Sequence, residues 1–310
     1  MPASNRIPLL IDTDPGVDDA WALLMAFASP AHDVLGLTIT AGNVGLEHTV
    51  RNALKLCEVA GVDVPVFPGC ALPLVFPAED AAYVHGRDGF GDTGFLPPTR
   101  KAESEHAALA MIRLSHAHPG LLLVCLGPLT NLALALRLDP TLPSRVGRLV
   151  VMGGAVTGQG NTSVSAEFNI AFDPEAAHIV FDAFPAYDIV DWEGVLRHGL
   201  PHADVEQWLD GPTPKASFYK AISQRTREWS EGRRGTHWHS ADGLAMAAAL
   251  EPEAATGWHL HAVEVETGGR LTRGATVVDW AGRSGRPAKA RILAGLRPER
   301  FRHWLHLALA

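Results

Sequence analysis

The sequence has very few cysteines, and their spacing excludes one class of scaffold. Cys57, Cys70 and Cys125 are the three thiols among 310 residues, and no two of them form a Cys-x-x-Cys pair. This pattern argues against a disulfide framework and against a structural zinc site, because both need cysteines that are paired at suitable spacing. We therefore expect a protein of the reducing cytoplasm.

The sequence also lacks long apolar runs and an excess of positive charge. No uncharged apolar stretch approaches the ~18 residues that a membrane-spanning helix needs, and the opening MPASNRIPLL does not resemble a secretory signal. The 26 basic side chains are outnumbered by 34 acidic ones, which gives a net charge of −8. Because an acidic chain is poorly matched to a nucleic acid or an anionic membrane, we expect neither as a partner.

What the sequence does contain is an alternation of short apolar runs and longer segments of helical periodicity. Such nearly all-apolar runs are typical of strands that are buried on both faces of a parallel sheet. The predicted strands are residues 7–11, 34–39, 121–126, 148–152 and 187–190. The predicted helices are residues 17–28, 46–60, 103–117, 129–137 and 174–184. This order predicts a single α/β domain over residues 1–310, with an open, mostly parallel, Rossmann-like sheet flanked by helices.

The C-terminal part follows a different pattern. Residues 262–280 alternate around Gly268 and Gly269, which predicts a β-hairpin, with an edge of the sheet as its expected place. Residues 297–310 are predicted to end the chain as a helix. The helical segment 216–229 is assigned to the core, and a lid over a pocket is the alternative.

Glycine and small polar residues follow every predicted strand. The segments are DTDPGVDD, TAGN, GPLTN, the long loop 153–173, and Asp191 with Glu193. Ligands of open α/β sheets bind beyond the carboxyl ends of the strands. Turns between strands and helices are rich in these residues in any case, but their combination with an acidic cluster favours a site.

The acidic cluster consists of Asp12, Asp14, Asp18 and Asp19. Asp18 and Asp19 fall in the first turn of a predicted helix, where capping and the helix dipole would explain a negative charge. Capping does not explain Asp12 and Asp14 at the end of an apolar strand. Crowded carboxylates suit a hard cation, Ca²⁺ or Mg²⁺, so we favour a metal site over capping alone.

The long loop 153–173 has neither a helical nor a strand period, and loops of this length in compact domains are usually functional or disordered. In its AEFNI segment, an extended backbone would turn Glu167 and Asn169 to one side and Phe168 to the other. A carboxylate beside an amide suits sugar hydroxyls. An ordinary surface loop is the alternative.

Two histidine-containing segments are further candidates. His85 lies in the glycine-rich stretch 83–94, whose G-x-G-x-x-G match is rejected as a dinucleotide site because a strand and a helix do not frame it. His237 and His239 are interpreted as surface residues rather than ligands of a transition metal, because no third ligand has a known position. Asp242 precedes an apolar helix, where it either caps the helix or completes a metal shell from a distance.

Seven segments carry a resemblance to a known family. In chain order they are DTDPGVDDA, TAGN, HGRDGFG, GPLTNLALAL, MGGA, AEFNIAFDPEAA and ADGLAMA. Their order and approximate spacing resemble those of the nucleoside hydrolases, in the inosine–uridine-preferring branch. The resemblance is strong over residues 7–250 and weak beyond them. The D-x-D-P-G-x-D-D signature is specific, and its occurrence together with G-P-L-T-N and E-F-N leaves little room for chance.

The resemblance implies hydrolysis of the N-glycosidic bond of ribonucleosides to ribose and free nucleobase, in nucleoside salvage or catabolism. It implies Ca²⁺ as the cofactor, with Asp14 activating a metal-bound water as general base. The implied metal ligands are Asp14, Asp19, Asp242 and the backbone carbonyl of Leu126, where family members often have threonine. The residues implied to hold the ribose are Asp18, Asn43, Asn161, Glu167 and Asn169, with Met152 under the sugar. A homodimer or homotetramer is implied in the same way.

One departure from the family pattern concerns the leaving base. The resemblance places a histidine, as proposed acid, immediately before the last metal aspartate, but this chain has Ala241 there. We hypothesise that His85 or His239 donates a proton to the base, or that Trp238 stacks on it. A restriction to easily departing bases is the remaining option. Phe168 matches the inosine–uridine branch, since the purine-specific branch tends to have tryptophan at this position.

Two other functions compete with nucleoside hydrolysis. A nucleoside- or ribose-binding protein with little catalysis would agree with Ala241, but it has less need of a general base. A metal-dependent phosphatase would use Asp12 of the DTD segment as nucleophile, which Pro15, Gly16 and the aspartates after them fit poorly. The sequence leaves the preferred base, the oligomeric state and the pathway open.

Overall fold

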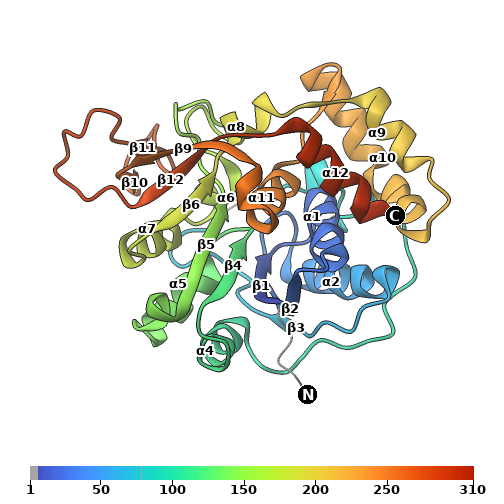
Figure 1. The fold of residues 1–310 in the computed structure, drawn as a ribbon, viewed down its shortest axis with the longest axis horizontal. Coiled ribbons are helices and arrows are strands. Elements are labelled where there is room, and N and C mark those ends of the chain that lie inside the picture. Colours follow the sequence, from blue (N-terminus) through green and yellow to red (C-terminus); the bar gives the residue numbers. More distant parts are fainter. Residues whose placement is uncertain (1–5, 78) are drawn as a thin grey trace.

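The computed structural model describes residues 6–77 and 79–310, with the backbone alone at residue 234. Its centre is an eight-stranded sheet in the order β3-β2-β1-β4-β5-β6-β12-β9 (Figure 1). The strands are β1 (Ile7–Thr13), β2 (His32–Ile39), β3 (Val66–Pro68), β4 (Leu121–Cys125), β5 (Val146–Met152), β6 (Tyr187–Val190), β9 (Ala255–His261) and β12 (Ala290–Leu296). Neighbouring strands pair in parallel, except that β12 and β9 are antiparallel.

Helices cover both faces of this sheet and bury two separate apolar cores (Figure 1). One core involves α1 (Val17–Ala28), α2 (Leu46–Ala60), α10 (Pro214–Arg234), α11 (Ala241–Leu250) and α12 (Pro298–Leu309). The other involves α4 (Ala107–Ala117), α5 (Thr130–Leu138) and α7 (Pro174–Ala183). Over the described residues, no helix is both long enough and apolar enough to cross a membrane.

Shorter elements lie in the connections. They are α3 (Ala82–His85), α6 (Phe168–Phe172), α8 (Trp192–Arg197), α9 (His202–Leu209), the 3₁₀ helices Leu142–Arg145 and Pro252–Ala254, and the two-stranded sheet of β7 (Leu200–Pro201) and β8 (His237–Trp238). The turn α6 falls inside the loop 153–173, so the expectation of a loop without regular structure is wrong at its C-terminal end.

The predicted fold class is confirmed, because the sheet is mostly parallel and helices flank it. All five predicted strands are present, and β1 runs on to Thr13 so that it includes Asp12. The helix predicted from residue 103 begins only at Ala107. Strands β3, β9 and β12 were not predicted. Strand β3 has three residues, and β9 is a half-exposed edge strand, so neither leaves a long apolar run in the sequence.

The predicted C-terminal hairpin is present, but it does not extend the main sheet. Strands β10 (Val263–Val265) and β11 (Thr276–Val278) pair antiparallel with each other in a sheet of their own. The edge that was expected for this hairpin is formed by β9, which pairs with β12. The predicted closing helix is α12.

Candidate active site

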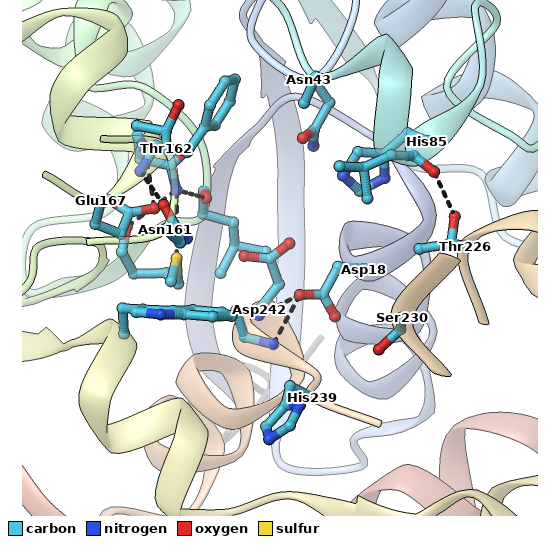
Figure 2. A pocket seen from close by; sticks show the side chains of 18 of the residues that line it. Asp18, Asn43, His85, Asn161, Thr162, Glu167, Thr226, Ser230, His239 and Asp242 are labelled. Carbon is cyan, nitrogen blue, oxygen red and sulfur yellow. Dashed lines mark hydrogen bonds between the residues drawn. The ribbon is translucent and has the colours of Figure 1, made fainter. Parts of the chain in front are cut away.

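A cavity of about 120 Å³ lies at the carboxyl ends of the central strands (Figure 2). The polar segments that follow β1, β2, β4 and β5 converge there, as expected for an open α/β sheet. Twelve of the residues singled out from the sequence line it: Asp18, Asn43, His85, Leu126, Met152, Asn161, Glu167, Phe168, Asn169, Trp238, His239 and Asp242. Two more, Asp14 and Asp19, are buried and do not line it.

Asn43 connects the two buried aspartates to the cavity. Its backbone N–H donates to Asp14 Oδ2 at 2.7 Å, and its side-chain amide donates to Asp19 Oδ2 at 2.9 Å. Asp19 also accepts from the Thr13 hydroxyl at 2.5 Å and from the Gly16 N–H at 3.0 Å. The end of β1, the start of α1 and the loop after β2 therefore hold both carboxylates in place.

Two glycines let the Asp14 carboxylate lie directly against neighbouring backbone. A Cβ atom at Gly42 would lie 2.1 Å from Asp14 Oδ2, and one at Gly127 would lie 2.4 Å from Asp14 Oδ1. Both distances are far inside van der Waals contact, so a side chain at either position would displace Asp14. The glycines of TAGN and GPLTN, which the sequence places after two predicted strands, thus make room for a site residue.

The buried carboxylates form an electrostatically unfavourable group on their own. Burial, reinforced by the charge of Asp19, raises the pKa of Asp14 well above its usual range. Burial and the charges of the neighbouring aspartates do the same to the pKa of Asp242. In the described part of the chain, no lysine or arginine forms an ion pair with either residue or with Asp19.

Asp18 ties the start of α1 to the start of α11. Its carboxylate accepts from the Ser240 hydroxyl at 2.8 Å, from the Ala241 N–H at 2.7 Å and from the Asp242 N–H at 3.3 Å. Burial raises the pKa of Asp18 to about 6. The capping alternative for Asp242 is wrong, because Ser240 is the N-cap residue and Asp242 lies inside the first turn, where it lines the cavity (Figure 2).

The AEFNI segment reaches the cavity by a different geometry from the one expected. Its backbone is extended at Glu167, the N-cap of α6, but turns helical from Phe168 on, so that Asn169 lies in the first turn of that helix. The Glu167 carboxylate accepts from the N–H groups of Gly154, Asn169 and Ile170 at 3.0, 3.0 and 3.2 Å. Burial raises the pKa of Glu167 to about 7. Phe168 lines the same cavity as its two neighbours instead of pointing away.

The Asn169 amide joins α6 to the ends of β4 and β5. Its Nδ2 donates to the carbonyl oxygen of Leu126 at 2.6 Å and to that of Met152 at 3.2 Å. At the other end of the segment, the Phe168 N–H donates to Asn161 Oδ1 at 2.9 Å. Through these bonds, the side-chain amides of Asn161 and Asn169 lie on the wall of the cavity that contains the Leu126 carbonyl.

The histidines stand away from this wall. Figure 2 shows His85 on the side of the cavity opposite Glu167 and Asn161, with His239 below. The Val17 N–H donates to His85 Nδ1 at 3.1 Å, so a neutral His85 carries its proton on Nε2. The expectation of a surface position is wrong for His239, which lines the cavity, whereas His237 is exposed.

Sequence analysis missed the aromatic and hydroxyl side chains that complete the cavity, which include Tyr83, Thr162, Trp192, Thr226, Trp229 and Ser230. Three of them belong to α10, whose earlier residues Tyr219 and Ile222 are fully buried in the core. The helix is therefore core at its start and cavity wall farther on. Following its apolar face by helical spacing beyond Ile222 would have found Thr226 and Trp229.

Other polar residues at strand ends hold the scaffold instead of lining the cavity. Asp12 Oδ1 accepts from the Thr38 hydroxyl at 2.8 Å and from the Asn131 amide at 2.9 Å. The Thr130 hydroxyl donates to Asp173, which caps α7. Asp12 is therefore a fully buried residue that joins β1 to β2 and α5.

The donor set at the cavity suits a hard divalent cation. The candidate ligands are oxygen atoms only, from Asp242 and the Leu126 carbonyl at the cavity and from Asp14 and Asp19 buried behind it, and Ca²⁺ and Mg²⁺ prefer such ligands. Within residues 6–77 and 79–310, no three His, Cys, Asp or Glu side chains form a ready-made metal cluster. A cation here would therefore also need backbone, water or substrate oxygens. The observation that fits a cation is the crowding of buried carboxylates whose pKa values are raised by burial and by one another.

Sequence comparisons with known proteins point the same way. The model of the inosine-uridine preferring nucleoside hydrolases matches residues 9–303. The non-specific ribonucleoside hydrolase RihC of Klebsiella pneumoniae subsp. pneumoniae is 39% identical over 300 residues, which cover 96% of this chain and 97% of the relative. The protein of the same name from Salmonella enteritidis is 38% identical over 298 residues, which cover 96% of this chain and 95% of the relative.

Solved structures resemble the whole chain. An inosine-guanosine nucleoside hydrolase matches with a TM-score of 0.93 and 32% identity over 99% of both chains. The plant nucleoside hydrolase PpNRh1 matches with a TM-score of 0.91 and 32% identity over 98% of both. A purine-preferring ribonucleoside hydrolase from Gardnerella vaginalis matches with a TM-score of 0.90 and 31% identity over 97% of this chain and 98% of its own.

Proposed function

The chain belongs to the inosine-uridine preferring nucleoside hydrolase family, and on this premise we propose that it hydrolyses the N-glycosidic bond of ribonucleosides with Ca²⁺ as cofactor. The products are ribose and the free base. The observation that carries the proposal is a cavity lined by Asp18 and Asp242 and backed by the buried Asp14 and Asp19. Glycosidic cleavage develops positive charge on the sugar, which such carboxylates stabilise.

Each residue has one proposed task. Asp14 takes the proton of the attacking water as general base. The cation would be held by Asp14, Asp19, Asp242 and the carbonyl oxygen of Leu126. The ribose hydroxyls would be bound by Asp18, Asn43, Asn161, Glu167 and Asn169, with Met152 under the sugar. When bound, a divalent cation lowers the pKa of water and orients hydroxyl groups.

The chain's own contacts prepare Asp14 for this task. The Asn43 N–H holds Asp14 Oδ2 at 2.7 Å, and the backbones at Gly42 and Gly127 close in on both carboxylate oxygens. The carboxylate is thereby oriented before the substrate binds, and oriented groups lose little freedom during the reaction. Burial of the residue keeps bulk water away from it.

The departing base needs a proton or another form of stabilisation. Because Val17 sets the His85 tautomer with the proton on Nε2, we propose His85 as the donor. His239 lines the same cavity and is the alternative donor, and Trp238 is the candidate for stacking on the base. Tyr83, Trp192 and Trp229 add further aromatic surface for a base.

We expect His85→Ala to lower kcat for inosine by about a hundredfold or more, because general acid catalysis contributes on that scale. Hydrolysis of p-nitrophenyl riboside should stay near the wild-type rate, since nitrophenolate departs without a proton. The same pair of assays on His239→Ala shows which histidine is the donor. Equal losses on both substrates would assign His85 to binding, and wild-type rates on both would remove it from the reaction.

We also propose a broad range of bases. The relatives that are 38–39% identical are named non-specific, and stacking on aromatic side chains tolerates any base. Release of free ribose from inosine, uridine, cytidine, adenosine and guanosine, with and without a chelator, tests the proposal. We expect release from purine and pyrimidine nucleosides, its loss with the chelator and its recovery with Ca²⁺.

Each outcome of that assay decides one point. Release that is insensitive to the chelator would overturn the proposal that hydrolysis requires a cation. Release from purines alone would overturn the broad range. If none of the five nucleosides yields ribose, the nucleoside-binding protein becomes the better hypothesis, and binding titrations would measure it.

We further propose a cytoplasmic homodimer or homotetramer. The three cysteines, Cys57, Cys70 and Cys125, are free thiols, as a reducing compartment would keep them. Exposed apolar side chains such as Leu72, Phe76 and Val164 supply surface that an interface between copies would bury. Sedimentation equilibrium measures the assembly, and a monomer at micromolar concentration would contradict it.

A further inference from the structure

Glu193 does not line the cavity, yet it is bonded to the loop that carries Asn161. Its carboxylate accepts from the Val156 N–H at 2.7 Å, the Thr157 N–H at 2.8 Å, the Thr157 hydroxyl at 2.8 Å and the Gln159 N–H at 3.1 Å. Glu193 is 5% exposed. Both oxygens of a buried carboxylate are thus used to hold one short stretch of loop.

The loop has little else to hold it in place at this end. Between β5 and α6 it forms no helix or strand, and residues 157–159 are exposed. The next residues bond within the loop, from the N–H of Gly160 to Val164 and from the N–H of Asn161 to Ala166, and Asn161 Oδ1 accepts from the Phe168 N–H at the start of α6. Asn161 follows Gln159, the last residue bound to Glu193, after a single intervening position. Asn161 is thus held from α6 on one side, while Glu193 fixes the chain two residues before it.

The start of α8 is built to present this carboxylate. Asp191 caps the helix by accepting from the Gly194 N–H at 2.9 Å, and the Trp192 N–H donates to the Gly154 carbonyl at 2.9 Å. Burial raises the pKa of Asp191 to about 7. Burial also opposes ionisation of Glu193, but the hydrogen bonds that the loop donates help to leave the pKa of Glu193 below its usual value. Glu193 is therefore an ionised acceptor.

We propose that Glu193 is a positioning residue for ribose binding, which holds the first half of the loop against α8 and so places Asn161 in the cavity before the substrate arrives. The inference rests on the proposed function only through the task given to Asn161. Without Glu193, the loop would have to be ordered when the nucleoside binds, and the lost conformational freedom would weaken binding.

Glu193→Gln keeps the volume but replaces one acceptor oxygen by an N–H donor that faces other donors. We expect KM to rise about tenfold, on the order of 1.4 kcal/mol, which is the scale of a hydrogen bond to a charged group. The factor should be the same for inosine and uridine, because they share the ribose, and kcat should stay within about threefold. A fall in kcat with an unchanged KM would overturn the proposal.

Thr157→Val removes one of the four hydrogen bonds and leaves the other three. It should give a smaller rise in KM in the same direction, and it keeps the proposal testable if Glu193→Gln does not fold. Glu175→Gln is the matched control, since Glu175 is a partly buried carboxylate in the first turn of a helix, as Glu193 is, but binds Arg273 instead of the loop. Its KM should equal that of the wild type, and a rise as large as that of Glu193→Gln would overturn the proposal.

A double-mutant cycle separates positioning from general stabilisation. If Glu193 acts through Asn161, then adding Glu193→Gln to Asn161→Ala should raise KM by less than about threefold, because coupled residues are not additive. Full additivity would overturn the proposal. Ribose release by the wild type, measured in the same assay, tests the proposed function separately, so a wild-type enzyme that turns over while Glu193→Gln behaves identically overturns this inference alone.

Discussion

Replacing Asp14 by asparagine is expected to lower kcat for nucleoside hydrolysis by about a thousandfold or more, which is within the range of general base catalysis. Asparagine keeps the shape of the side chain, and its oxygen can still accept the Asn43 N–H now found 2.7 Å from Asp14 Oδ2. What disappears is the group that takes the proton of water, together with one anionic oxygen for the cation. Ribose release at saturating inosine and Ca²⁺ measures the effect.

Asp12→Asn is the matched control. Asp12 lies two residues earlier, inside β1, and is fully buried, with its Oδ1 held by scaffold side chains. An asparagine oxygen can keep the hydrogen bonds that Thr38 and Asn131 now donate. We expect kcat to stay within about tenfold of the wild type, as for a buried change outside the reaction. An inactive Asp12→Asn beside an active Asp14→Asn would instead favour the phosphatase, with Asp12 as nucleophile.

Replacing Asp242 by asparagine is expected to stabilise the metal-free protein while it abolishes the response to Ca²⁺. Burial and the charges of neighbouring aspartates raise the pKa of Asp242 in the folded chain. At pH 8, ionisation of Asp242 therefore costs free energy in the folded chain but not in the unfolded chain, where the carboxylate is solvated. Removing the charge should raise Tm in chelator by about 2 °C or more, the scale of a 1 kcal/mol change in a chain of this size. Turnover should fall at least about a hundredfold with the loss of a cation ligand.

Thermal melts with chelator and with Ca²⁺ measure both effects. The wild type should gain stability from Ca²⁺, because a ligand of the native state alone stabilises it, and the variant should not. Asp63→Asn is the control, since Asp63 is an exposed carboxylate paired with Arg100 far from this charge cluster, and it should change neither melt. A lower Tm for Asp242→Asn in chelator would contradict the repulsion, and an undiminished Ca²⁺ shift would remove Asp242 from the cation site.

The two predictions share one physical cause. A site that binds a cation must hold anionic oxygens together, and doing so without the cation destabilises the fold. The chain limits this penalty with hydrogen bonds to the charged forms, from Asn43 to Asp14 and Asp19, and from Ser240 and the α11 amides to Asp18. These donors also fix the directions in which the carboxylates point.

Some of the site could be predicted because its signals are local. The cluster after β1 is contiguous in the sequence, and so are the segments that contain Asn43, Glu167 and Asn169. Local patterns did not correctly predict the backbone conformation of these segments or the residues that cap their helices. The AEFNI segment was expected to be extended, but the Glu167 carboxylate caps α6 and so stabilises a helical turn. Capping of its own helix was one of the two alternatives for Asp242, but Ser240 is the N-cap residue and Asp18 accepts from the Ala241 N–H.

The sequence by itself determined the α/β architecture and the segments from which the cavity is built, because strand burial and helix amphipathicity leave periodic patterns of apolar residues. The tertiary structure alone decided which side chains meet. The bond from the Ala241 N–H to Asp18 spans 223 positions, and the Glu193 carboxylate reaches back 37 positions to the Val156 N–H. Contacts of this kind depend on how the sheet and the helices pack in three dimensions. Neither the periodicity of apolar residues nor the spacing of motifs along the chain predicts them.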